Sequence, residues 1–113
     1  MDVLEKIKVC DLSALCAYEG RVALVDGQQV ALFLIPNQGV FALQNWDPIG
    51  KAFVLSRGIV GDVKGKLCVA SPLYKQHFCL RSGECLENSD VRLAHWPVLL
   101  ENDEVFLEWH AKA

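Results

Sequence analysis

Two short segments of the sequence place polar side chains at spacings at which a loop could present them to a single ligand. The first reads Asn45-Trp46-Asp47-Pro48, so an amide and a carboxylate are separated by one residue. The second begins Ser71-Pro72-Leu73-Tyr74, so a hydroxyl and a phenol are separated by two residues. Amide and carboxylate oxygens suit hard cations, whereas neutral serine and tyrosine oxygens are poor ligands. We therefore predict no metal site at these four positions.

Other combinations of reactive side chains are weaker candidates. Ser71, His77 and Asp47 could in principle form a hydrolytic triad, but Ser71 is not on the Gly-x-Ser-x-Gly turn that exposes a nucleophile. Cys79 lies two residues after His77, with Cys68 and Cys85 nearby in the sequence, yet no Cys-x-x-Cys or Cys-x-x-His pair is present. We interpret these cysteines as small core residues.

A thiol pair is the alternative that stays open for the cysteines. Cys79 and Cys85 flank a predicted hairpin, and residues that face each other across a hairpin could form a disulfide. The sequence does not fix the register of that hairpin, and cytosolic thiols are normally reduced.

The elements that must position these residues are short strands. Apolar segments alternate with turn residues every eight to twelve positions, which indicates an all-β sandwich or barrel. Asp26-Gly27 is typical of a tight hairpin turn, and Asp11 is expected to cap a helical turn over residues 12–17. Two irregular loops, 45–56 and 71–76, each follow a strand, and function on such scaffolds usually lies on loops. The expected strands cover residues 7–10, 21–25, 29–35, 40–44, 58–63, 66–70, 77–80, 85–86, 91–98 and 105–109.

Composition restricts the class of protein. The chain has 113 residues, of which 52% are hydrophobic and 22% charged, which predicts one globular domain over residues 1–113. The net charge of -3 argues against a nucleic-acid-binding protein. The longest apolar run, residues 30–36, is too short for a membrane span. Charged residues near the start do not fit a signal peptide, and five cysteines suit a reducing compartment, so we expect a cytoplasmic protein.

The two loops resemble those of Rieske domains, which hold a [2Fe–2S] cluster between a Cys-x-His loop and a Cys-x-x-His loop. In this chain Asn45 and Asp47 occupy the first pair of ligand positions, and Ser71 and Tyr74 occupy the second. Such clusters need thiolate sulfur on one iron and imidazole nitrogen on the other. The resemblance therefore implies an all-β, Rieske-type (ISP-like) antiparallel β-sandwich or barrel with two inserted loops and no [2Fe–2S] ligands.

The substitutions are similar to those of one branch, the small subunits of assimilatory NAD(P)H-dependent nitrite reductases. The similar motifs are Asp47-Pro48, the run from Leu55 to Gly58 and the run from Ser71 to Phe78. One departure is Ile49, where an aromatic residue commonly follows the Asp-Pro pair. The similarity extends from about Ile7 to Trp109.

This resemblance implies a partner protein rather than a catalyst. In that enzyme the large subunit carries FAD, siroheme and a [4Fe–4S] cluster and reduces nitrite to ammonium in nitrate and nitrite assimilation. The small subunit would support or dock to it and would have no catalytic residues or cofactor of its own. The alternatives are a Rieske-like electron carrier and a binding module for another oxidoreductase.

The residues expected to face a partner lie on or beside the two loops. Trp46 is a candidate interface residue because it sits on a loop, whereas Trp96 and Trp109 sit on predicted strands and are expected in the core. Arg57 is expected either to brace its loop or to pair with a carboxylate such as Asp47. The expected partner-facing set is Trp46, Pro48, Arg57, Pro72, Tyr74 and Lys75.

Overall fold

The structure is a computed structural model that describes residues 2–112 and the side chains of residues 4–110. Strands dominate this part of the chain, and two short 3-10 turns, η1 (Leu12–Ala14) and η2 (Leu55–Arg57), interrupt them. The strands are β1 (Asp2–Asp11), β2 (Gly20–Val25), β3 (Gln28–Ile35), β4 (Gly39–Gln44), β5 (Trp46–Asp47), β6 (Ala52–Phe53), β7 (Ile59–Val63), β8 (Lys66–Ala70), β9 (His77–Cys79), β10 (His95–Trp96), β11 (Val98–Glu101) and β12 (Glu104–Lys112).

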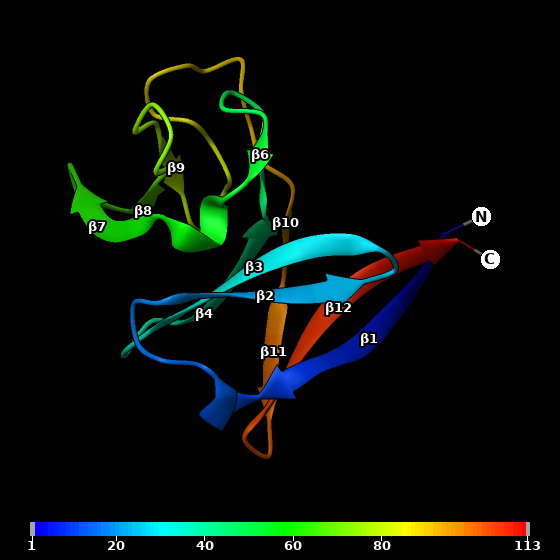
Figure 1. The fold of residues 1–113 in the computed structure, drawn as a ribbon. Helices are drawn as coiled ribbons and strands as arrows, with labels where there is room; N and C mark the ends of the chain where they lie inside the picture. The colour runs from blue at the N-terminus through cyan, green and yellow to red at the C-terminus, as the bar shows by residue number, and fades with distance from the viewer. Residues whose placement is uncertain (1, 113) are drawn as a thin grey trace.

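The strands form a larger and a smaller lobe (Figure 1). The larger lobe contains the sheet β1-β12-β11 and the sheet β10-β4-β3-β2, all of whose paired strands are antiparallel. The smaller lobe, which we call the loop lobe, contains the two-stranded sheet β5-β6 and the sheet β7-β8-β9. The all-β, antiparallel prediction is confirmed.

Strand β3 is the shared wall of the two hydrophobic cores. Successive side chains of a strand point to opposite faces, and here both faces are covered. Val30 and Leu32 pack with Leu107 and Trp109 inside the larger lobe. On the other face, Phe33 belongs to the core of the loop lobe together with Leu55, Val69, Phe78, Leu80 and Leu93. Burial on both faces explains why this strand has an unbroken apolar run rather than an alternating pattern.

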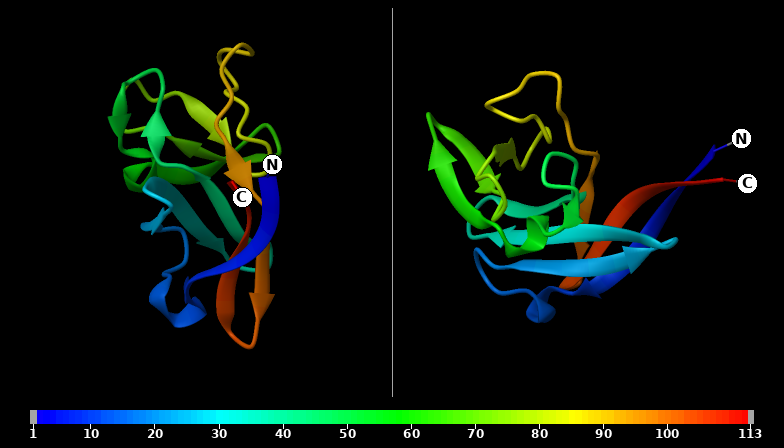
Figure 2. Two further views of the ribbon diagram at one scale, coloured as in Figure 1. Left: turned by 90° about the vertical axis from the view of Figure 1, so that its right-hand side faces the viewer. Right: turned by 45° about the horizontal axis from the view of Figure 1, so that its top comes forward.

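The β2–β3 hairpin follows the turn prediction. Asp26 and Gly27 both have positive φ, 49° and 77°, as a two-residue hairpin turn of this kind requires. In the same lobe, β1 and β12 pair along their length, so Asp2 and Lys112 lie side by side (Figure 2). Within residues 2–112, no helix is long and apolar enough to cross a bilayer.

Several boundaries differ from the sequence-based expectations. The first strand begins at Asp2 rather than at Ile7. The expected strand over residues 91–98 contains β10 and only the first residue of β11, Val98. Pro97 separates the two strands, because its missing N–H cannot join a ladder. The expected loop 45–56 contains the short β5–β6 pair. Residues 85–86 form no strand, although Cys85 makes an isolated bridge with Phe78.

The expected helical turn is also shorter than predicted, and its capping was wrongly assigned. It covers only η1, and the side chain of Asp11 makes no capping hydrogen bond. Its carboxylate instead lies 2.9 Å from the ammonium of Lys8, which is on the preceding strand.

Candidate functional site

The carboxylate of Asp47 is the centre of the contact between the two loops. Its Oδ1 atom accepts hydrogen bonds from the backbone N–H groups of Ile49 (2.9 Å) and Gly50 (3.0 Å). This is the turn geometry that an aspartate favours, with Pro48 fixing the backbone after it. Its Oδ2 atom accepts a 2.5 Å hydrogen bond from the hydroxyl of Ser71 on the second loop. One carboxylate therefore closes its own turn and joins the two loops.

Ser71 completes this contact from the other side. Besides donating to Asp47, its Oγ accepts from the backbone N–H of Leu73 at 3.2 Å. Its own N–H donates to the carbonyl of Gln76 at 2.9 Å, which closes the second loop. The side chain is only 1% exposed, as is that of Asp47. Water is therefore excluded from the bond between them.

Asn45 fixes the base of the first loop to the sheet. Its Nδ2 donates to Oε1 of Gln29 on β3 (2.8 Å), and its Oδ1 accepts from the N–H of Ser56 (2.8 Å). Its backbone carbonyl accepts from Val54 and Leu55. The side chain is 2% exposed. Gln29 is a functional partner that the sequence did not reveal, because it lies on a different strand sixteen residues earlier.

Tyr74, the fourth of these positions, is not part of this network. Its side chain is 76% exposed, and its backbone is left-handed with φ of 52°, followed by Lys75 with φ of 56°. Each non-glycine residue in that region costs roughly 1–2 kcal/mol. The second loop is thus a tight turn that directs Tyr74 outward, away from Asp47 and Ser71.

These residues do not fit a [2Fe–2S] cluster. A Rieske cluster requires two thiolates and two imidazoles, and the four positions offer oxygens and one amide nitrogen. Three of the four side chains already use their polar atoms in hydrogen bonds with one another, with the backbone or with the side chain of Gln29. Among the described residues no buried side-chain polar atom lacks a partner. No group of three or more His, Cys, Asp and Glu residues in that part of the chain could hold a metal ion.

The space between the loops is also filled by packing. A Cβ atom at Gly50 would lie 2.7 Å from a terminal carbon of Leu73, so these two turns are in close contact. Glycine is therefore required at position 50 by lack of room rather than by its φ angle. The two loops touch directly where a cluster would have to separate them.

The outer surface of the first loop carries two aromatic rings. Trp46 and Phe53 are exposed and paired across β5–β6, with ring centroids 4.8 Å apart in an edge-to-face arrangement. Together with Leu24, which is 71% exposed, they line a cavity of about 370 Å³. Trp46 was singled out from the sequence, whereas Phe53 and Leu24 were missed because only the register of β5–β6 and the β2–β3 hairpin bring them there.

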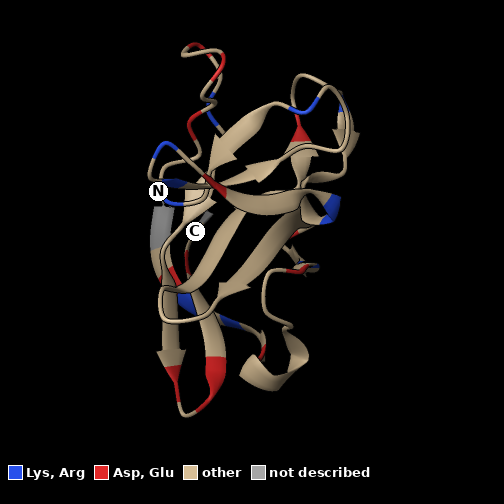
Figure 3. Ribbon diagram, turned by 90° about the vertical axis from the view of Figure 1, so that its left-hand side faces the viewer, with Lys and Arg blue, Asp and Glu red and all other residues tan. Residues whose placement is uncertain are grey.

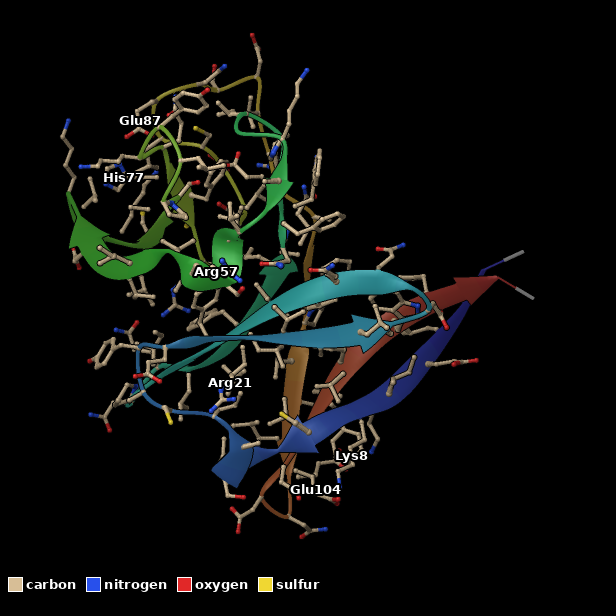
Figure 4. All side chains as sticks on the ribbon, in the orientation of Figure 1. Lys8, Arg21, Arg57, His77, Glu87 and Glu104 are labelled. Carbon is tan, nitrogen blue, oxygen red and sulfur yellow. The ribbon has the colours of Figure 1, made fainter. Side chains whose placement is uncertain are left out.

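The remaining residues expected at a partner surface are mostly accessible. Pro72, Lys75 and Arg57 are exposed, and Pro48 is half-buried. Arg57 ends η2 at the border between the loop lobe and β2 (Figure 4). The suggested pair between Arg57 and Asp47 is wrong, because the three hydrogen bonds on Asp47 come from Ile49, Gly50 and Ser71.

His77 has a partner that rules out the hydrolytic arrangement. Its Nδ1 atom lies 2.6 Å from Oε2 of Glu87, and its backbone N–H donates to Oε1 of the same residue at 2.7 Å (Figure 4). Burial disfavours the charged form of Glu87, but these hydrogen bonds from His77 outweigh that effect and lower the pKa of Glu87. The hydroxyl of Ser71 is bonded to Asp47 instead, so no Ser-His-Asp triad forms.

The register of the sheet pairs different cysteines from those suggested by the sequence. Cys79 on β9 lies directly opposite Cys68 on β8, whereas Cys85 lies opposite Phe78 and joins the core of the loop lobe. A bridge between Cys79 and Cys85 would thus have to join opposite faces of one hairpin. All five cysteines are free thiols.

The two opposed thiols differ in acidity. Burial and the neighbouring Cys79 raise the pKa of Cys68 to about 11. Burial also opposes ionisation of Cys79, but hydrogen bonds from the Ser82 side chain and from the backbone of Arg81 and Ser82 lower the pKa of that thiol. Cys79 is therefore the more reactive member of the pair.

Comparison with known proteins agrees with this geometry. The sequence matches the Rieske-like [2Fe-2S] domain over residues 6–108. It is 38% identical over 100 residues to the nitrite reductase (NADH) small subunit of Salmonella typhimurium, covering 88% of this chain and 93% of that protein. The solution structure of the nitrite reductase [NAD(P)H] small subunit from Erwinia carotovora superposes with a TM-score of 0.80 at 39% identity, covering 96% of this chain and 84% of that one.

A third relative differs in length. The nitrite reductase [NAD(P)H] large subunit of Klebsiella oxytoca is 41% identical over 99 residues, which are 88% of this chain but only 10% of that protein. A domain of this kind thus also occurs inside a much longer chain. The chain belongs to the Rieske-like [2Fe-2S] domain family, in the branch of nitrite reductase small subunits.

Proposed function

We propose that this chain is the cluster-free small subunit of an NAD(P)H-dependent nitrite reductase and acts by docking to the large subunit. The observation that carries the proposal is the hydrogen-bond network of Asn45, Asp47 and Ser71. It uses the side chains at three of the four ligand positions: Asp47 and Ser71 join the two loops directly, and Asn45 attaches the first loop to β3. The fold is thereby kept, and the capacity to hold iron is lost.

The nature of the partner is supported by the relative in which a similar domain lies within a large subunit. Covalent attachment keeps two domains at a high effective concentration, so a separate small subunit would need a binding surface to reach the same arrangement. The large subunit is then the component that holds FAD, siroheme and a [4Fe–4S] cluster and reduces nitrite to ammonium. This chain supplies no catalytic group to that reaction.

The surface that we assign to docking is the loop lobe, with Trp46, Pro48, Arg57, Pro72, Tyr74 and Lys75 as contact residues. Exposed aromatic side chains are the residue type that most often dominates the energy of a protein interface, and both Trp46 and Tyr74 are exposed. The ends of the chain lie on the larger lobe, away from these loops (Figure 1). A tether at either end would therefore leave the loop lobe free to meet a partner.

We further propose that the chain acts as a single domain in the cytoplasm. The free thiols support a reducing compartment. The shared strand β3, which lies in both hydrophobic cores, supports one cooperative unit rather than two.

The test is to produce the chain in iron-replete cells, alone and together with the large subunit. The isolated chain should be colourless and free of iron and acid-labile sulfide, and it should co-purify with the large subunit. Stoichiometric iron with a visible absorption band would instead identify an electron carrier. Absence of any complex with the large subunit would contradict the assigned partner.

A further inference from the structure

The charges of this chain are unevenly distributed. The segment 45–76, which contains both loops, has five Lys and Arg residues and two Asp and Glu residues, a net charge of +3. The rest of the chain has six basic and twelve acidic residues, a net charge of -6. An acidic protein thus has a basic segment, and that segment forms most of the loop lobe.

The basic residues of this segment are not neutralised by neighbours. Within the described side chains, ion pairs involve Lys6, Lys8, His77 and Arg92. None involves the five exposed cations of segment 45–76, which are Lys51, Arg57, Lys64, Lys66 and Lys75.

Most of the acidic side chains near these cations already have a hydrogen-bond or ion-pair partner. Asp47 is buried and bonded to Ser71, and Asp62 accepts from the N–H of Gly65. On the neighbouring segment, Glu84 pairs with Arg92 and Glu87 pairs with His77. Asp90 on that segment is exposed and makes none of the described ion pairs. The exposed side chains of segment 45–76 carry a net positive charge. In contrast, Glu101, Asp103 and Glu104 gather at the β11–β12 turn, at the end of the molecule remote from the loops (Figure 3).

Two of these cations, Lys51 and Lys75, lie at the tips of the two loops. The contact between Gly50 and Leu73 holds the two turns together, so Lys51 and Lys75, which follow these residues, lie on adjacent turns. Both have left-handed backbones, with φ of 57° and 56°. Glycine or asparagine would adopt this conformation at lower cost, so the backbone gives no reason for lysine at either place.

We infer that the loop lobe docks on an acidic surface of its partner, with Lys51 and Lys75 at the centre of the contact and Arg57, Lys64 and Lys66 around them. This inference rests on the proposed function, which supplies the large subunit as the partner. Complementary charges speed association and fix orientation more than they add to affinity. The aromatic rings of Trp46 and Tyr74, set among these cations, would supply the desolvated part of the contact.

The experiment measures the affinity of the full chain for the purified large subunit in 50 mM and 500 mM NaCl. Raising the salt shortens the screening length from about 14 Å to about 4 Å. We expect binding to weaken by about tenfold, chiefly through a slower association rate. The double variant Lys51→Glu/Lys75→Glu should bind at least tenfold more weakly than the native chain at 50 mM NaCl, and each single variant should show an intermediate loss.

Arg21→Glu is the matched control for the single variants, because Arg21 is exposed on β2 in the larger lobe, makes none of the described ion pairs, and the change alters the charge by the same amount. It should leave the affinity unchanged, and circular dichroism melts should show all variants folded. The inference would be overturned if neither added salt nor the charge reversals at Lys51 and Lys75 changed the affinity. The assignment of the large subunit as partner would then remain intact. Failure of the native chain to bind at either salt concentration would count against the proposed function itself.

The charge separation also allows copies of this chain to associate with one another. Light scattering at 50 mM NaCl tests this directly. Self-association that disappears in the double variant, with unchanged affinity for the large subunit, would overturn the inference by assigning the basic surface to a second copy.

Discussion

The hydroxyl of Ser71 donates a 2.5 Å hydrogen bond to the carboxylate of Asp47 across 24 positions of the sequence, and both side chains are buried. In the Rieske arrangement these two positions hold a cysteine and a histidine that meet only through the cluster. Here they meet directly. A side-chain hydrogen bond to a charged group has taken over the task of joining the two loops.

Removing the hydroxyl of Ser71 should destabilise the protein. Ser71→Ala leaves Oδ2 of Asp47 buried without its donor, which costs about 2 kcal/mol. Asp47→Ala should cost more, because it also removes the acceptor for the N–H groups of Ile49 and Gly50. Urea denaturation checks both values. Ser89→Ala, at an exposed position, is the control; equal midpoints for Ser71→Ala and Ser89→Ala would refute a stabilising role for the bond.

Adding a methyl group at Gly50 should disturb the contact between the loops. Its Cβ would lie 2.7 and 2.9 Å from carbons of Leu73, and overpacking of this kind costs about 1–3 kcal/mol. Gly61→Ala is the matched change, because no heavy atom lies within 4 Å of the added carbon there. Thermal melts should place the Gly50 variant well below the Gly61 variant, and the reverse order would contradict the packing described for these turns.

Truncating Tyr74 should weaken the complex with the large subunit without affecting folding. The side chain is largely exposed, so Tyr74→Ala should leave the melting temperature unchanged while raising the Kd about tenfold if the residue is an interface anchor. Tyr18→Ala is a close control, because Tyr18 is also exposed and also has positive φ, 65°, but precedes β2 in the larger lobe. If both variants bind like the native chain, the second loop is not part of the contact.

Mild oxidation should link Cys68 to Cys79. The N–H of Leu80 donates to the carbonyl of Leu67 at 2.9 Å, so the next pair along the ladder, Cys68 and Cys79, is a non-hydrogen-bonded pair. In such pairs the Cβ atoms are closest, about 4.5 Å apart, which is near the spacing of a disulfide. Diamide, as the two-electron oxidant, would accept the electrons and protons of the two thiols.

Peptide mapping of the diamide-treated native protein identifies the linked pair. Cys85→Ser should leave the disulfide in place, whereas Cys79→Ser should abolish it. A disulfide between Cys79 and Cys85 under native conditions would contradict the register of β8 and β9.

Glu87 should contribute to stability in a way that depends on pH. Hydrogen bonds from His77 lower the pKa of Glu87 below its value in the unfolded chain. The folded state therefore favours the ionised form, and the contribution is present above the unfolded pKa of about 4.3 and lost as the pH falls through the lower folded pKa. Denaturation between pH 6 and pH 3 should show a smaller loss of stability for Glu87→Gln than for the native chain. Glu19→Gln is the control, because Glu19 is exposed and makes none of the described ion pairs. This variant should lose stability with falling pH as the native chain does. The same dependence of unfolding free energy on pH in all three proteins would refute the linkage.

Much of the architecture could be predicted because it depends on local sequence patterns. Residues Asp26 and Gly27 are typical of the hairpin turn that they form, and the turn residues between apolar segments separate most of the strands. The boundaries that failed depend on pairing over long distances. Residues 91–98 have the composition of a strand, but only two of them find a partner on β4.

The sequence by itself determined which chemistry the four loop positions can perform, because the identity of a side chain fixes its ligand atoms. Asp47 and Ser71 offer oxygen atoms, whereas a Rieske cluster uses imidazole nitrogen and thiolate sulfur. Only the tertiary structure decided which residues these side chains contact and hydrogen-bond instead. The bond between Asp47 and Ser71, the pairing of Cys79 with Cys68 and the meeting of Trp46 with Phe53 all depend on strand register and loop closure, which are set by the packing of both lobes against β3.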